Sequence, residues 1–83
     1  MSNELNSLTA AKTVDARGMA CPGPLLEAKK SIGGVPVSQI VEIQSNDAGS
    51  RNDLAAWGKK VGHEYLGFIE AAGFDRHFVR RKK

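Results

Sequence analysis

The spacing of apolar residues along this chain predicts strands and helices that alternate. In the segment 40–45, apolar residues alternate with polar ones, with Glu42 and Gln44 opposite the apolar side, which is typical of a strand with one buried face. Runs of β-branched and aromatic residues predict three more strands, at 12–15, 65–70 and 76–80. Residues 72–75 are predicted to form the turn between the last two strands, which would therefore make a hairpin.

Two other segments repeat their apolar residues at the spacing of an amphipathic helix. The first is predicted at about 22–32 and ends at a pair of glycines. The second is predicted to be capped by Ser50, with Asp53 in the capping-box position, and to end at Gly62. Its apolar stripe consists of Leu54, Trp57, Gly58 and Val61. Because Trp57 lies in this stripe, we expect it in the core.

The resulting order, β-α-β-α-β-β, defines the expected fold. It predicts an α/β (α+β) two-layer sandwich with two helices on one face of a four-stranded mixed sheet. A chain of 83 residues is too short to cover both faces of such a sheet. We expect residues 1–10 to be a flexible N-terminal tail and residues 11–83 to be a single domain.

Composition narrows the possible classes of protein. Hydrophobic residues make up 41% and charged residues 25%, as in ordinary globular proteins. The chain has no basic and apolar leader and no apolar run long enough for a membrane span, so we expect a cytoplasmic protein that does not contact membranes. A single cysteine excludes an internal disulfide. His63 and His77 lack metal-ligand spacing around it, so we expect neither a metal nor a cofactor.

The cysteine lies where a predicted strand gives way to a predicted helix, in the segment Gly18-Met19-Ala20-Cys21-Pro22-Gly23-Pro24. Gly18 permits a turn, and Pro22 suits the first position of a helix. Because the prolines lack an N–H, Gly23 is expected to offer a hydrogen-bond donor near the sulfur. This donor and the helix dipole would lower the pKa of the Cys21 thiol. A lone cysteine is usually buried and inert, whereas a junction of this kind lies at the surface and favours a reactive thiol.

The motif Cys21-Pro22-Gly23-Pro24 is the Cys-Pro-x-Pro signature of the TusA/SirA-like family of small sulfur carrier proteins. The chain resembles that family from about Lys12 to Lys82. Further residues that match the family are Gly18, Leu25, Leu26, Asp47, Asp53, Leu54, Trp57, Gly62, His63 and Glu64. The family often has Asp-Pro before its second helix, whereas Ala48 follows Asp47 here. This departure affects only the expected rigidity of that turn.

The resemblance implies that Cys21 accepts a sulfane sulfur as a persulfide and passes it to a cysteine of a partner protein. We expect a monomeric, stoichiometric carrier without a substrate pocket. Its partners would be a protein sulfur donor, either a cysteine desulfurase or a rhodanese-like protein, and a protein sulfur acceptor. The pathway stays open between tRNA thiolation, cofactor synthesis and sulfur oxidation, and the adduct between a persulfide and a thiosulfate-like group. Arg17 and Met19 flank the motif as candidate docking residues, the alternative being a solvated arginine and a core methionine.

Two other functions compete with sulfur transfer. The basic C-terminal segment favours RNA binding through attraction to phosphates, although the chain has no RNA-binding signature and few aromatic residues for stacking, so we do not expect direct nucleic-acid binding. Its cations are Arg76, Arg80, Arg81, Lys82 and Lys83. A charged terminal strand also commonly just keeps a sheet edge soluble. The second competitor is a redox or peroxide-handling thiol enzyme, which the absence of a resolving cysteine disfavours.

Overall fold

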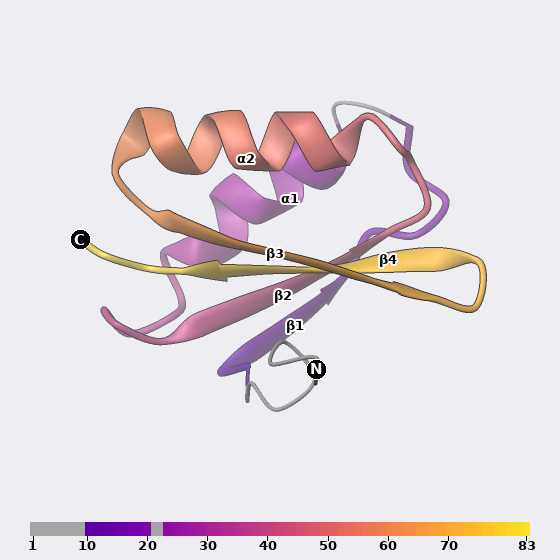
Figure 1. Ribbon diagram of the computed structural model, residues 1–83. Helices are drawn as coiled ribbons and strands as arrows, with labels where there is room; N and C mark the ends of the chain where they lie inside the picture. Colours follow the sequence, from indigo (N-terminus) through magenta and orange to yellow (C-terminus); the bar gives the residue numbers. More distant parts are fainter. Residues whose placement is uncertain (1–9, 21–22) are drawn as a thin grey trace, which may run out of the picture.

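The strands and helices follow the predicted order. The computed structural model describes residues 10–20 and 23–83 (Figure 1). Its elements are β1 (Lys12–Asp15), α1 (Gly23–Ile32), β2 (Ile40–Ser45), α2 (Ser50–Val61), β3 (Glu64–Ala71) and β4 (Phe74–Arg80). Most of the predicted N-terminal tail, residues 1–9, lies outside the described residues.

The four strands form one mixed sheet in the order β1-β2-β4-β3. β1 is parallel to β2, and β4 is antiparallel to both β2 and β3. β3 therefore runs parallel to β2, with β4 inserted between them. Each helix connects two parallel strands, and right-handed crossovers place both helices on the same face of the sheet, as Figure 1 shows. The predicted two-layer α+β sandwich is confirmed.

The core lies between this face and the helices. Its buried members are Ala16, Ala28, Ile32, Val35, Val41, Ile43, Leu54, Trp57 and Val79. Trp57 is 7% exposed, which confirms that it is a core residue. Val61 is 38% exposed, so the apolar stripe of α2 stops one turn before the end of the helix. Fully burying one large apolar side chain contributes roughly 1.5–3 kcal/mol, so this layer is the main source of stability.

The face of β2 that points away from the helices is less exposed to solvent than the alternation of apolar and polar residues in this strand predicts. Glu42 lies on this face but is only 6% exposed, because the Arg76 guanidinium of β4 pairs with it at 3.0 Å from Nε to Oε2. Burial would raise the pKa of Glu42, but hydrogen bonds from Arg76 and Gln44 outweigh burial and hold the pKa below its usual value. Phe78 on the same face is fully buried, with the Arg76 guanidinium 5.4 Å from its ring centroid.

Two local predictions are wrong. Gly49, not Ser50, is the N-terminal cap of α2 and makes no side-chain cap hydrogen bond. Ser50 is the first helical residue, and its buried Oγ lies 3.1 Å from Oγ of Ser45. The hairpin turn is also shorter than expected, because Phe74 and Asp75 already belong to β4 and Gly73 turns the chain at φ 81°.

Candidate functional site

Three connections meet at one end of the sheet. β1 and β2 are parallel, so the loops that follow them, residues 16–20 and 46–49, leave from the same edge, and both helices begin there. The turn between β3 and β4 lies at this edge as well, since Ser45 is paired with Asp75 of β4 (Figure 1). We call these two loops, the turn and the first turns of α1 and α2 the cysteine end.

The loop that leads to the motif is held by backbone hydrogen bonds. Ala16 is fully buried, and its N–H donates to the Gln44 carbonyl at 2.8 Å. Gly18 has φ 85°, a left-handed conformation that confirms the turn predicted at this glycine. The Gly18 N–H donates to Oδ1 of Asn46 at 2.9 Å, which joins the loop 16–20 to the loop 46–49.

The motif itself is described only in part. Cys21 and Pro22 lie outside the described residues. Pro24 is buried in the first turn of α1, which begins at Gly23. The Gly23 N–H donates to the Ala20 carbonyl at 2.6 Å, so the prediction that it is a free donor for the sulfur is wrong.

Gly23 has a steric role instead. A Cβ at this position would lie 2.8 Å from Cβ of Met19, closer than real side chains approach. The glycine therefore lets the chain before the motif fold back over the start of α1. Met19 is 39% exposed, so it is not the core methionine of the alternative interpretation.

Arg17 is paired within its own segment. Its Nε lies 2.9 Å from Oδ1 of Asp15 and its guanidinium lies 5.0 Å from the centroid of the Phe74 ring. The side-chain hydrogen bond from Arg17, together with its backbone N–H, lowers the pKa of Asp15 to about 2. Both side chains are about half exposed, at 48% and 57%. Arg17 thus lies over β4 beside the hairpin turn, and its role in docking stays a prediction.

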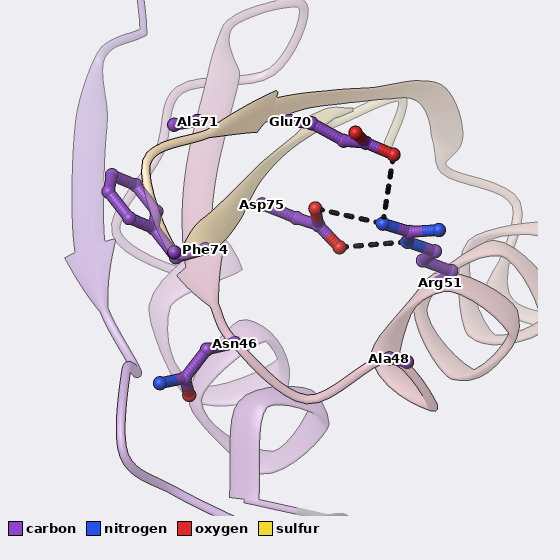
Figure 2. A pocket seen from close by; sticks show the side chains of 8 residues that line it. Asn46, Ala48, Arg51, Glu70, Ala71, Phe74 and Asp75 are labelled. Carbon is purple, nitrogen blue, oxygen red and sulfur yellow. Dashed lines mark hydrogen bonds and ion pairs between the residues drawn. The ribbon is translucent and has the colours of Figure 1, made fainter.

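A polar pocket of about 250 Å³ lies between the start of α2 and the β3–β4 hairpin (Figure 2). Arg51 donates two hydrogen bonds to Asp75, at 2.8 and 3.1 Å, and one to Glu70 at 3.3 Å. The hydrogen bond from Arg51 keeps the pKa of Asp75 below its usual value. The same guanidinium lies 4.3 Å from the centroid of Phe68. Asn46 also lines the pocket, and its Oδ1 accepts the Gly18 N–H. The pocket therefore borders the residue that holds the loop before the motif.

Sequence patterns do not reveal this cluster. Arg51 and Asp75 are 24 positions apart, and neither belongs to a motif. Asp47, a residue that matches the family, lies just before α2, and its Oδ1 accepts the Gly49 N–H at 3.3 Å. The other oxygen of Asp47 is buried and has no hydrogen-bond partner among the described residues.

A buried histidine follows Asp75 by two residues along β4. His77 is fully buried, with Nδ1 2.8 Å from the Tyr65 hydroxyl and with Nε2 unpaired among the described residues. Burial lowers the pKa of His77, although the nearby Asp75 opposes this shift, and burial raises the pKa of Tyr65 to about 12. Both side chains are therefore neutral at neutral pH.

Membrane spans and metal sites are both missing from the described part of the chain. None of its helices has the length and apolar character needed to cross a membrane. Within residues 10–20 and 23–83, no three His, Cys, Asp or Glu side chains converge as metal ligands would.

Comparisons with known proteins agree on one family. The family model described as Sulfurtransferase TusA matches residues 12–81. A putative sulfur carrier protein of Archaeoglobus fulgidus is 41% identical over 70 residues, which cover 84% of this chain and 96% of that protein. The sulfur carrier protein TusA of Allochromatium vinosum is 35% identical over 69 residues, covering 83% of this chain and 90% of the relative.

Two further similarities concern length and fold. The putative sulfur carrier protein YrkF of Bacillus subtilis is 40% identical over 89% of this chain, but the chain spans only 40% of that relative. The crystal structure of a SirA-like protein from Desulfitobacterium hafniense superimposes with a TM-score of 0.74 at 22% identity, covering 87% of this chain and 99% of the other. The latter likeness establishes the shared fold.

Proposed function

This chain belongs to the TusA family of sulfur carrier proteins, and on that premise we propose that Cys21 accepts a sulfane sulfur as a persulfide and gives it to a cysteine of a partner protein. The proposal concerns the chemistry at Cys21 and the transfer between proteins. Pro22 and Pro24 supply the rest of the motif, and Gly18 and Gly23 shape the backbone on either side of it.

The observation that carries the proposal is the position of the motif at the start of α1. The residues Gly18, Met19 and Ala20 before the cysteine are all exposed, and α1 begins at Gly23 immediately after Pro22. The N-terminal end of a helix carries a partial positive charge that favours anions. Since the Gly23 N–H is already bonded, stabilisation of a sulfur anion rests on this dipole, which supports a lowered thiol pKa.

The proposed transfer is balanced without a redox cofactor. The Cys21 thiolate attacks the terminal sulfur of the donor persulfide, an S–S bond forms on Cys21, and the donor leaves as its thiolate. In the second step an acceptor thiolate attacks the terminal sulfur on Cys21 and releases the Cys21 thiolate. One sulfur atom moves in each step, and no electrons enter or leave the system.

We infer the partner classes and the compartment from the same chemistry. The donor is a cysteine desulfurase or a rhodanese-like protein, and the acceptor is a protein with a reactive cysteine. A free thiol used as a nucleophile suits the reducing cytoplasm. Arg17 and Met19 remain candidates for the docking surface, since both are exposed next to the motif. tRNA thiolation is one pathway that such a relay serves.

RNA binding finds less support. Two of the five aromatic rings are too buried to stack on bases, since Trp57 is 7% exposed and Phe78 is fully buried. Arg76 and Arg80 are already paired with Glu42 and Glu64. The remaining basic residues attract anions of any kind and do not by themselves favour a nucleic acid.

A labelling experiment tests the proposal. A cysteine desulfurase and ³⁵S-labelled cysteine are expected to label the wild-type protein and not Cys21→Ser, and unlabelled acceptor thiol is expected to remove the label. Labelling of Cys21→Ser to the wild-type level would contradict the proposal. Circular dichroism of both proteins verifies that the substitution has left the fold intact.

A further inference from the structure

A groove lies between α1 and α2 and is lined by residues of these two helices. Its volume is about 250 Å³. The residues that line it are Leu25, Lys29, Asp53, Ala56, Trp57 and Lys60. Both helices cover the same face of the sheet (Figure 1) and begin at the cysteine end.

The floor of the groove is apolar. Leu25 is half-buried, Ala56 is exposed, and Trp57, which is 7% exposed, also lines the groove. Leu26, the next residue of α1, is 55% exposed. Such a surface favours contact with an apolar side chain of another molecule.

The groove is polarised along its length. Asp53 and Leu25 belong to the first turns of α2 and α1, whereas Lys29 and Lys60 belong to the last turns. Both lysines are exposed. Other cations gather beyond them, at what we call the basic end. Its members are Lys29, Lys30, Lys59, Lys60, Arg81, Lys82 and Lys83.

The groove also leads to the cysteine end. Leu25 is two residues past Gly23, in the turn that begins directly after the Cys-Pro pair. From Leu25 to Lys29 the helix rises about 6 Å. A segment of a partner that lies in the groove therefore points one end toward the loop that carries Cys21.

We propose that this groove binds an acidic segment with an apolar anchor, belonging to the protein that exchanges sulfur with Cys21. The inference rests on the proposed function, because it names the kind of surface that the sulfur partner presents. Glutamates or aspartates of the segment pair with Lys29 and Lys60, and its apolar side chain lies against Leu25 and Trp57. Such contacts orient a partner and accelerate encounter.

A protein segment fits the groove better than a nucleic acid does. The Trp57 ring is too deeply buried for a base to stack on it. The Asp53 carboxylate lies in the path of a phosphate backbone that follows the groove. A peptide with carboxylates at one end only meets the lysines without approaching Asp53.

Disulfide exchange with defined peptides tests the inference. The probe peptide carries, in this order, two glutamates, a leucine and, after a spacer of varied length, a cysteine activated as its 2-thiopyridyl disulfide. The Cys21 thiolate attacks the peptide sulfur, a mixed disulfide forms, and pyridine-2-thiolate leaves and is measured by absorbance. At low salt, the acidic peptide should react about tenfold faster than the same peptide with lysines in place of the glutamates.

Two double variants with the same change of charge separate the groove from the general field of the protein. Lys29→Glu with Lys60→Glu should abolish the preference for the acidic peptide. Lys30→Glu with Lys59→Glu, in the same helical turns but outside the groove, should retain most of it. Replacing the leucine of the peptide by serine should reduce the rate with the wild-type protein.

Three outcomes would overturn the inference. They are an equal loss of preference in both double variants, no preference in the wild type, and binding of a single-stranded RNA oligonucleotide that is lost only in the groove variant. Loading of each variant from glutathione persulfide is measured in parallel. A protein that keeps the peptide preference but accepts no sulfur would refute the proposed function and leave the groove assignment standing.

Discussion

The two ends of the sheet carry different sets of charged residues. At the cysteine end Arg17 pairs with Asp15 and Arg51 with Asp75, and Asp47 and Asp53 lie there as well. At the basic end the four helix lysines are exposed, and Glu64 lies 3.0 Å from Arg80 and 3.9 Å from Lys82. The first end is therefore held together by short-range ion pairs, and the second is a source of positive potential.

This difference separates two tasks that a sulfur carrier must perform. The loop before the motif needs a defined backbone, which hydrogen bonds and a glycine with φ 85° provide. Recruitment of a partner needs attraction over a longer distance, which exposed cations provide. These cations lie in the last turns of α1 and α2 and in the C-terminal segment, at the end of the helices away from the motif.

Removing an ion pair at the cysteine end should lower Tm much more than removing one at the basic end. Arg51→Met removes the partner of Asp75, whose side chain is 10% exposed, and leaves that carboxylate unpaired in the protein interior. We expect this substitution to lower Tm more than any of the variants that follow. Arg80→Met is the control, because its partner Glu64 is 45% exposed and water replaces the lost contact. Equal decreases in Tm, measured by circular dichroism, would contradict the distinction.

Glycine backbone conformation gives the next largest effect. Neither Gly18 nor Gly33 has an atom near the position of an added Cβ, but only Gly18 has a positive φ. Gly18→Ala should lower the free energy of unfolding by about 1 kcal/mol and should slow sulfur loading, because the loop to Cys21 shifts. Gly33→Ala should be neutral or slightly stabilising. Urea denaturation measures both, and an unchanged Gly18→Ala variant would show that this loop carries no strain.

Acidification should affect the interior histidine more than the one at the basic end. Burial lowers the pKa of His77, so the unfolded chain takes up the proton first, at the ordinary value of 6.5. The stabilising contribution of neutral His77 is thus complete above pH 6.5 and is lost as the pH falls below it. His77→Gln should flatten the dependence of Tm on pH between 7 and 5.

His63 supplies the control for this titration. Its pKa is also lowered, first by burial and then by Arg81 and Lys83, but the side chain is only partly buried and accepts the Lys82 N–H at 3.1 Å. His63→Gln should change the pH profile less than His77→Gln. A larger change for His63→Gln than for His77→Gln would mean that the histidine at the basic end, and not the interior one, governs stability in acid.

Much of the fold follows from local sequence signals. The bounds of β1 and β2 agree with the prediction, because alternation and flanking glycines act over a few residues. The start of β4 differs from the prediction because Asp75 is held by Arg51, 24 residues away, and this contact overrides a turn-like sequence. The predicted Ser50 cap is wrong for a similar reason, since the Ser50 hydroxyl meets Ser45 of the preceding strand.

In the candidate site, too, some features follow from the local sequence and others depend on contacts between distant segments. The turn at Gly18 and the family membership follow from the motif and its neighbours, since both depend on residue type and spacing. The contact of Gly23 with Met19 depends on how the loop folds over α1, and the spacing of residues does not reveal it. Cys21 as the sulfur-carrying residue stays a prediction from the sequence and the family.

The intact mass of the protein after exposure to glutathione persulfide tests this prediction most directly. We expect the wild type to gain the mass of one sulfur atom and to lose it on treatment with dithiothreitol, while Cys21→Ser gains none. A mass increase that resists dithiothreitol would instead be sulfinic acid. That result, or equal loading of Cys21→Ser, would contradict the account.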